Sequence, residues 1–147
     1  MNNQSLLSNG WAFVLPPIMI ILMDYMIADY RDYFRGKRIT LMGLGLLGRG
    51  VGDAKFLVEC GAKLIVTDLK SAKDLTPSLK KLTKLKKLII YRLGQHRLED
   101  FKNRDLIIKG ADVPLDSSYI AEAKKNKISV VMSTALFVKF AQSSGAK

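Results

Sequence analysis

The sequence predicts an α/β fold built on a five-stranded parallel sheet with helices on both faces. Short apolar segments alternate with helical patterns from residue 33 onward, which is typical of strands joined by crossover helices. The first apolar segment runs directly into Gly43, Gly45 and Gly48, and the second ends in an acid, Asp68. Strands covered on both faces have nearly continuous apolar runs, as these do. We expect right-handed crossovers.

The first half of the sheet surrounds the glycine-rich segment. We expect strands at residues 38–42 and 63–67, with a helix at 47–60 between them that Gly61 ends. A second helix is expected to begin at Thr76 and reach about residue 85. Its threonine can cap the helix and Pro77 suits the first helical position, because proline has no N–H to leave unpaired there.

The second half repeats the alternation. We expect a strand at 88–92, a loop or single turn at 94–102, a strand at 105–109, a helix reaching residue 125, a strand at 128–132 and a last helix at 135–142. Ser117 or Ser118 can cap the helix that ends at residue 125, because a serine hydroxyl accepts hydrogen bonds from first-turn N–H groups. Ser133 or Thr134 can begin the last helix.

Length and cysteine content restrict the class of protein. A chain of 147 residues is long enough for one domain with a proper core;. It has a single cysteine, Cys60, which excludes a disulfide framework and is compatible with a reducing cytoplasm;. Because Cys60 lies near the end of a helical pattern, we expect it to be a small buried apolar residue and not a reactive thiol.

The formal net charge of +11 is unevenly distributed. Residues 1–30 contain no lysine or arginine, whereas many lysines fall in 70–87. A basic segment can attract nucleic acid, an anionic membrane or a polyanionic small molecule. No aromatic residues interleave with these lysines, so a stacking platform for bases is not expected. We interpret the segment as a solvated basic face, with no nucleic-acid partner.

The first 30 residues differ from the rest of the chain. Residues 11–23 are nearly all apolar but are interrupted by Pro16 and Pro17, and a membrane span needs roughly twenty apolar residues. A peripheral anchor, an upstream extension and a short docking segment all remain open, and we favour an extension without membrane contact. Residues 31–142 are the expected domain, and 143–147 are the beginning of a linker.

The glycine segment has the order that a nucleotide diphosphate site needs. The first glycine permits a tight turn, the second lets backbone approach the phosphates, and the third lets helix and strand pack closely. The helix amino terminus then offers N–H groups and a positive dipole end to an anion. Asp68 can accept hydrogen bonds from a ribose or a base. The alternative is a glycine-rich turn that binds nothing.

Two further loops should join this site, because ligands of open α/β sheets lie beyond the carboxyl ends of the strands. Residues 68–70 follow the second strand and residues 109–114 follow the fourth. Lys70 can bring positive charge toward a phosphate or lie over a ring. Gly110 permits close backbone approach. An ordinary loop entering a helix is the alternative for 109–114.

Several segments together resemble a known family. Residues 34–48 (Phe-Arg-Gly-Lys-Arg-Ile-Thr-Leu-Met-Gly-Leu-Gly-Leu-Leu-Gly) are similar to the start of the bacterial Mur ligases, and most closely to the branch that adds D-glutamate. Further matches are Ile-Val-Thr-Asp at 65–68, Leu-Gly-Gln-His-Arg-Leu-Glu-Asp-Phe at 93–101, Asp-Leu-Ile-Ile-Lys-Gly-Ala-Asp-Val-Pro-Leu at 105–115 and Ser-Thr-Ala-Leu-Phe at 133–137. The resemblance covers residues 33–147.

The resemblance implies a three-domain enzyme of which this chain is the first domain. That domain is Rossmann-like and binds the UDP part of UDP-N-acetylmuramoyl-L-alanine. The second domain holds a P-loop, ATP and Mg²⁺, and the third binds D-glutamate, whose amine attacks an acyl phosphate. The UDP-binding positions implied here are Gly43, Gly45, Leu46, Leu47, Gly48, Asp68, Leu69, Lys70, Gly110, Ala111 and Asp112.

The chain departs from the family pattern at two of these positions. Leu47 stands where many members have threonine, so a hydroxyl contact to phosphate is lost. Asp112 stands where glycine is usual, and its carboxylate could repel a diphosphate or its Cβ could strain the turn. His96 lies in a recurring loop, where we expect it to brace the loop or lie at the surface and not to act in catalysis.

The sequence also contains no G-x-x-x-x-G-K-[ST] phosphate loop;. We therefore expect no catalytic residue, metal site or bound cofactor in this chain, and no activity from it alone. Two other functions remain open. One is an NAD(P)-binding module of a dehydrogenase or regulatory protein, which Gly43, Gly45, Gly48 and Asp68 would also suit. The other is a basic membrane-surface or nucleic-acid binder.

Overall fold

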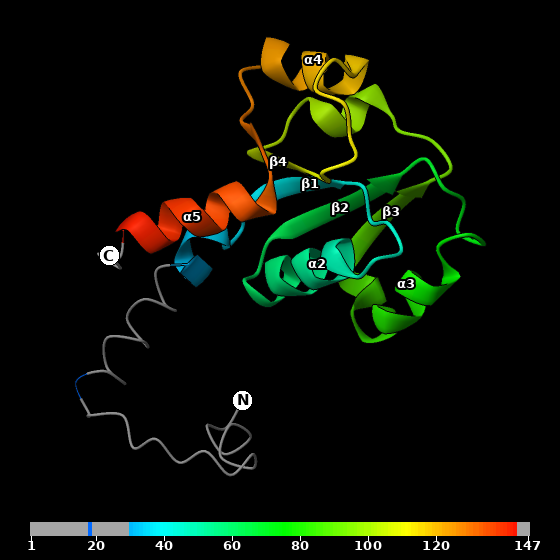
Figure 1. Cartoon of the computed structure of the whole chain (residues 1–147), viewed down its shortest axis with the longest axis horizontal. Coiled ribbons are helices and arrows are strands. Elements are labelled where there is room, and N and C mark those ends of the chain that lie inside the picture. Colours follow the sequence, from blue (N-terminus) through cyan, green and yellow to red (C-terminus); the bar gives the residue numbers. More distant parts are fainter. Residues whose placement is uncertain (1–17, 19–29, 144–147) are drawn as a thin grey trace.

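The computed structural model describes Ile18 and residues 30–143 and contains the parallel sheet that the sequence predicts (Figure 1). The strands are β1 (Arg38–Met42), β2 (Lys63–Asp68), β3 (Ile89–Leu93), β4 (Leu106–Lys109) and β5 (Val130–Val131). They pair in the order β3-β2-β1-β4-β5, and every pairing is parallel. The expected α/β, Rossmann-like fold class is confirmed.

Helices cover both faces of this sheet. They are α2 (Arg49–Glu59), α3 (Thr76–Lys81), the 3₁₀ helices η2 (Thr83–Leu88) and η3 (Leu98–Phe101), α4 (Ser118–Lys125) and α5 (Ser133–Ser143); residues 30–34 are also helical. Figure 1 shows α2 and α3 on one face of the sheet and α4 on the other. The alternation of strand and helix thus gives three layers.

The core divides into two clusters, one on each face of the sheet. Ile39 and Leu41 of β1 belong to the larger cluster with Leu57 of α2. Ile107 of β4 joins Phe101 and Ile120 in the smaller one. All of these side chains are almost fully buried, and each contributes on the order of 1.5–3 kcal/mol by leaving water. Both faces therefore hold the central strands in place.

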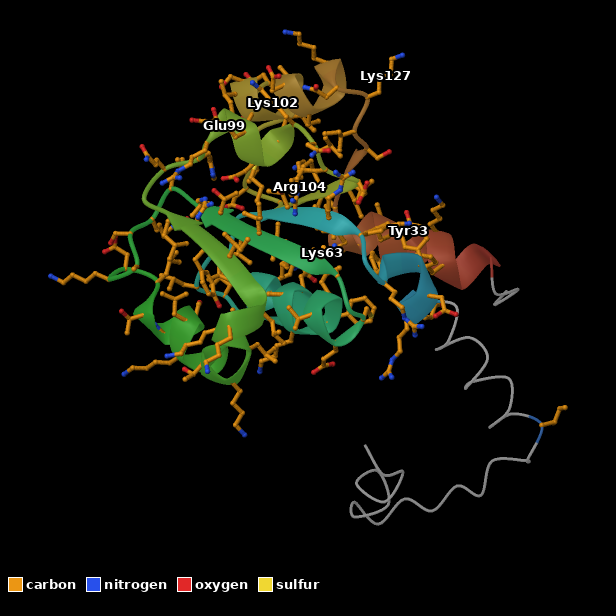
Figure 2. All side chains as sticks on the ribbon, turned by 180° about the vertical axis from the view of Figure 1, so that it is seen from behind. Tyr33, Lys63, Glu99, Lys102, Arg104 and Lys127 are labelled. Atoms are coloured by element: carbon orange, nitrogen blue, oxygen red, sulfur yellow. The ribbon has the colours of Figure 1, made fainter. Side chains whose placement is uncertain are left out.

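Charged side chains join β1 to its neighbours at the amino end of the sheet. Arg38 donates from its backbone N–H and guanidinium to the carboxylate of Asp105, at 2.7, 3.1 and 2.8 Å. This pairing holds the pKa of Asp105 well below its ordinary value. Arg104 donates to the carbonyl oxygens of Ile39 and Lys63, at 2.8 and 3.0 Å (Figure 2). These bonds fix the end of the sheet opposite the glycine loop.

The predicted helix from Thr76 to residue 85 is wrong in two respects. The α-helix stops at Lys81 and continues as the 3₁₀ helix η2. Leu79, Leu82 and Leu85 recur every third residue and all contact the core, which is the period of a 3₁₀ helix. Leu75 holds the cap position, and Thr76 instead donates through Oγ1 to the Lys73 carbonyl oxygen at 2.7 Å.

The other boundaries differ by a few residues. Helix α2 begins at Arg49, two residues after the expected start, and β5 has only two residues. Ser117 precedes α4 as expected but forms no side-chain cap. Cys60 is the cap residue that follows α2. It is buried, as predicted, and burial raises the pKa of its thiol.

The expectations for the two ends of the chain fall mostly outside the described residues. The apolar segment 11–23 lies there except for Ile18, and so does 144–147 of the expected linker. Over the part that the structure describes, no helix is both long enough and apolar enough to cross a bilayer.

Candidate functional site

The predicted site lies where the chain changes direction across the sheet. From β1 the chain moves outward to β2, whereas β4 pairs with the opposite side of β1. Ligands of open α/β sheets bind at such a switch point. Gly43 follows β1 and donates to the Thr67 carbonyl oxygen at 2.8 Å, and Gly110 follows β4 and donates to the Met42 carbonyl oxygen at 2.7 Å. The two loops therefore lie side by side.

The glycine loop depends on backbone conformations that other residues rarely adopt. Gly43, Gly45 and Gly48 have φ values of 99°, 61° and 90°, in the left-handed region that favours glycine. Gly48 is the cap residue of α2 and no side chain caps the helix. The first-turn N–H groups of α2 have no partner within the helix, so this terminus can receive an anion.

The glycine pattern of the sequence assigns the close packing of helix and strand to Gly48. In the structure this packing depends on Gly50 instead. A Cβ at Gly48 would meet nothing within 4 Å. A Cβ at Gly50 would lie 2.8 Å from the carbonyl carbon of Leu44 and overlap its oxygen. In the sequence, Gly50 is visible as a fourth glycine just beyond the three-glycine pattern, and this could have indicated the close contact.

Asp68 holds the glycine loop through its carboxylate. Its Oδ2 accepts hydrogen bonds from the N–H groups of Leu44 and Gly45, both at 2.9 Å. Its Oδ1 accepts one from the N–H of Lys70, also at 2.9 Å. The side chain is 5% exposed, so these are charge-assisted bonds in a poorly hydrated site. Both oxygens that were expected to face a ribose or a base are thus engaged by the protein backbone.

A second side chain that the sequence argument missed fixes the same loop. Ser78 of α3 donates through Oγ to the Gly45 carbonyl oxygen at 2.6 Å, and it is 2% exposed. Gly45 is therefore held at its N–H by Asp68 and at its C=O by Ser78. In the sequence, Ser78 is visible only as a serine on the apolar side of a short helix, and this alone does not identify its hydrogen-bond partner.

The loop after β4 is held by the lysine that precedes it. Lys109 is buried, and its Nζ donates to the carbonyl oxygens of Gly110 and Val113, at 3.1 and 3.0 Å. Asp112 does not strain this turn, since Lys127 is the non-glycine residue with positive φ among those described. Instead its Oδ1 lies 2.7 Å from where a Cβ on Gly110 would stand.

Four of the other predicted positions present side chains at the surface around these loops. Leu47 is fully exposed, Leu46 and Leu69 are 47% and 66% exposed, and Lys70 is exposed. Leu47 offers an apolar surface where a threonine hydroxyl would offer a hydrogen bond. The polar contacts available at this position are therefore those of the backbone.

His96 braces the carboxyl end of β2. Its Nδ1 lies 2.7 Å from Oγ1 of Thr67, and its ring stands edge-on to Tyr119 with centroids 5.0 Å apart. Burial lowers the pKa of His96, and the charge of Asp68 opposes this. The imidazole is thus neutral at pH 7. Across the described residues, no group of three or more His, Cys, Asp or Glu side chains could hold a metal ion.

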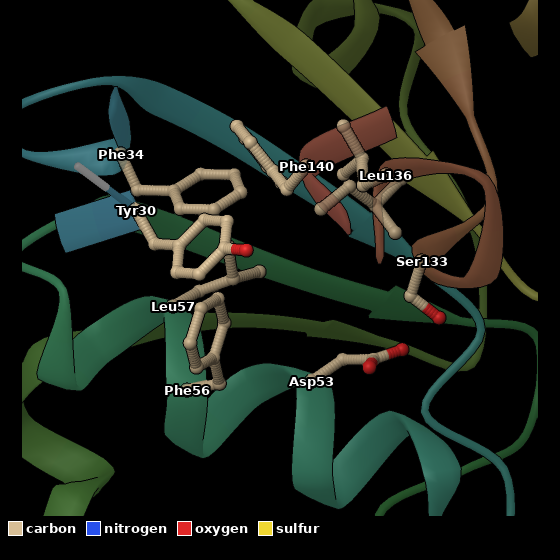
Figure 3. Close-up of a pocket in the computed structure, with 9 residues that line it drawn as sticks. Tyr30, Phe34, Asp53, Phe56, Leu57, Ser133, Leu136 and Phe140 are labelled. Carbon is tan, nitrogen blue, oxygen red and sulfur yellow. The ribbon is translucent and has the colours of Figure 1, made fainter. Parts of the chain in front are cut away.

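A separate cavity of 290 Å³ lies between α2, α5 and residues 30–34 (Figure 3). Its lining is mostly apolar and includes Phe34, Phe56 and Leu136. Asp53 and Ser133 form its polar end, where the Ser133 hydrogen bond opposes the rise in the pKa of Asp53 that burial causes. The sequence did not predict this cavity.

Comparison with known proteins identifies similar sequences. A UDP-N-acetylmuramoylalanine–D-glutamate ligase of Treponema pallidum (strain Nichols) is 41% identical over 110 residues, which are 74% of this chain and 20% of that ligase. Ligases of the same name from Borreliella burgdorferi (strain ZS7) and Roseiflexus sp. (strain RS-1) are 40% and 38% identical over 64% and 71% of the chain. The resemblance to the Mur ligases is confirmed.

The match to these Mur ligases is partial. The chain spans about a fifth of the length of the relatives it matches, between 20% and 22% in the three named here. No family model matches the chain. The similarity is therefore to one portion of a Mur ligase.

Proposed function

We propose that this chain is the nucleotide-binding portion of a D-glutamate-adding Mur ligase, an enzyme of peptidoglycan biosynthesis in the cytoplasm. Its ligand is the UDP end of UDP-N-acetylmuramoyl-L-alanine. The observation that carries the proposal is the glycine loop at the switch point, which hydrogen bonds with Asp68 and Ser78 hold in place, in a chain similar to these ligases. The domain comprises residues 31–142.

The proposed binding mode assigns different tasks to the two sides of the loop. The diphosphate faces the amino terminus of α2 and the N–H groups of Leu46, Leu47 and Gly48. The N–H groups of Leu44 and Gly45 are not available to it, because they already donate to Asp68. Leu69 and Lys70 lie against the uracil ring. The backbone of Gly110 and Ala111 completes the nucleotide side, where the carboxylate of Asp112 weakens the binding of an anion.

The chemistry of ligation belongs to parts of the enzyme outside this sequence. The sequence has no P-loop motif, and we therefore assign neither an ATP site nor a step of the reaction to its residues. We propose that ATP, Mg²⁺ and D-glutamate are bound by those other parts and that residues 1–147 alone are inactive. Their contribution is to bind and orient the substrate's nucleotide end.

Ligand-dependent stabilisation tests this function. We expect UDP and UDP-N-acetylmuramoyl-L-alanine to raise the melting temperature of the chain, because a ligand that binds only the folded state stabilises it. NAD and NADP should have no effect. Stabilisation by NAD or NADP and not by UDP would instead identify a dinucleotide-binding module. Release of ADP on mixing the chain with ATP, D-glutamate and substrate would contradict its proposed inactivity.

A further inference from the structure

A basic groove at the outer edge of the sheet is not part of the proposed UDP site. Strand β3 is at one edge of the sheet, and α3 and η2 precede it in the chain. Between them lies a groove with a volume of 680 Å³. Its lining includes Lys80, Lys86, Lys87, Leu79, Tyr91 and Leu93. It lies two strands away from β1, which carries the glycine loop.

The groove has positive charge without matching negative charge. Among the described residues, three lysines and no carboxylate line it. The segment 70–87 contains seven lysines and one acid, Asp74. Asp74 is engaged locally, because its Oδ2 accepts hydrogen bonds from the N–H and Oγ of Ser71 at 3.2 and 2.6 Å. A concave surface with one sign of charge raises the local concentration of an opposite ion.

The change from α-helix to 3₁₀ helix helps to place these side chains. Thr83 and Lys86 are three residues apart in η2 and so lie on one face; both line the groove. The hydroxyl of Thr83 donates to the Lys80 carbonyl oxygen at 2.8 Å, where α3 gives way to η2. The basic rim is thus built on hydrogen-bonded backbone and not on a free loop.

The floor of the groove is apolar and fixed by the core. Leu79, Tyr91 and Leu93 are partly buried and pack against the larger core cluster. Burial raises the pKa of Tyr91, so its phenol keeps a proton at neutral pH and can donate. The floor therefore suits an uncharged group attached to an anion.

We propose that this groove binds a phosphate-bearing ligand. The phosphate contacts Lys80, Lys86 and Lys87, and the uncharged part of the ligand lies on Tyr91 and Leu93. This chemistry is shared by soluble phosphorylated compounds and by phospholipid headgroups. A single-stranded nucleic acid fits less well, because Tyr91 is the one aromatic residue among the described residues of the lining, and a base-stacking platform uses several;.

Binding can be measured by NMR on the ¹⁵N-labelled chain of 147 residues with tripolyphosphate as the probe. We expect saturable shifts of amide signals from Thr83 to Leu93. Replacing two of the three lysines that line the groove (Lys86→Gln with Lys87→Gln) should weaken binding roughly tenfold, about 1.4 kcal/mol. The matched control is Lys124→Gln with Lys125→Gln, an equal charge change on exposed lysines of α4, which should leave the affinity unchanged.

Three results would overturn the site. Equal losses in both double variants would mean that net charge alone attracts the probe, and shifts confined to residues 43–48 would place the anion at the glycine loop. Affinity that grows with the length of a single-stranded oligonucleotide would also contradict a groove for one phosphate ligand. Vesicles of phosphatidylglycerol, compared with phosphatidylcholine, separate the two sources: a response to them and not to tripolyphosphate assigns the groove to a lipid headgroup.

Discussion

At the scale of single residues, Asp68 determines the shape of the candidate site. Its carboxylate accepts three backbone hydrogen bonds while almost fully buried. Asp68→Asn replaces one accepting oxygen with an NH₂ group, which donates and cannot accept, and removes the negative charge. We expect a loss of about 2–3 kcal/mol in the free energy of unfolding, since bonds to charged groups contribute roughly 1.5–3 kcal/mol each. Urea unfolding followed by circular dichroism measures this.

The control for Asp68→Asn is the same substitution at another carboxylate of the site, Asp112. Asp112 is exposed, so Asp112→Asn should change the free energy of unfolding by less than about 0.5 kcal/mol. The same substitution removes a negative charge beside the proposed diphosphate and should tighten UDP binding. Equal stability of the two variants would show that the Asp68 bonds do not hold the loop.

At the scale of elements, the contact between α2 and the glycine loop depends on one glycine. Gly50→Ala would force a Cβ against the Leu44 backbone, and we expect it to destabilise the fold by about 1–3 kcal/mol, as overpacking does. Gly52 lies on the same helix with nothing within 4 Å of a Cβ. Gly52→Ala should therefore stabilise by about 0.5–1 kcal/mol. Urea midpoints that move in the same direction for both variants would contradict this assignment.

The elements also show which features the sequence could predict. The strands follow from apolar runs, and the tight turn at Gly43 follows from local conformational freedom, so both could be predicted. The bonds of Asp68 and Ser78 join segments 23 to 33 residues apart, and no local pattern specifies such partners. The break between α3 and η2 was missed because leucines three residues apart also suit one face of an α-helix.

At the scale of the whole molecule, the sequence could predict where the candidate site lies but not which of its side chains a ligand can reach. Its three loops could be predicted together, since the carboxyl ends of parallel strands meet at one edge. The sequence could not predict which side chains remain available to a ligand. Asp68 and Lys109 turn toward the backbone of the loops and not outward. The side chains of Leu69 and Lys70 remain exposed, and the proposed binding mode depends on them.

The pH dependence of the global stability tests how His96 joins the sheet to α4. His96 contacts Thr67 of β2 and stacks edge-on with Tyr119 of α4. Burial lowers its pKa in the folded protein, whereas in the unfolded chain it is about 6.5. Below that pH the unfolded state binds more protons than the folded state. Stability is therefore full above about pH 6.5 and falls as the pH decreases toward the pKa of the folded state.

His96 is the one histidine of the chain, so a variant isolates its contribution. The free energy of unfolding, measured in urea between pH 8 and pH 5.5, should fall with decreasing pH in the unmodified chain. In His96→Gln that slope should be smaller, although the variant is less stable at pH 8 because the Thr67 contact is altered. Equal slopes in both proteins would show that His96 takes up its proton as readily when folded, and that it does not join the sheet to α4 as a neutral ring.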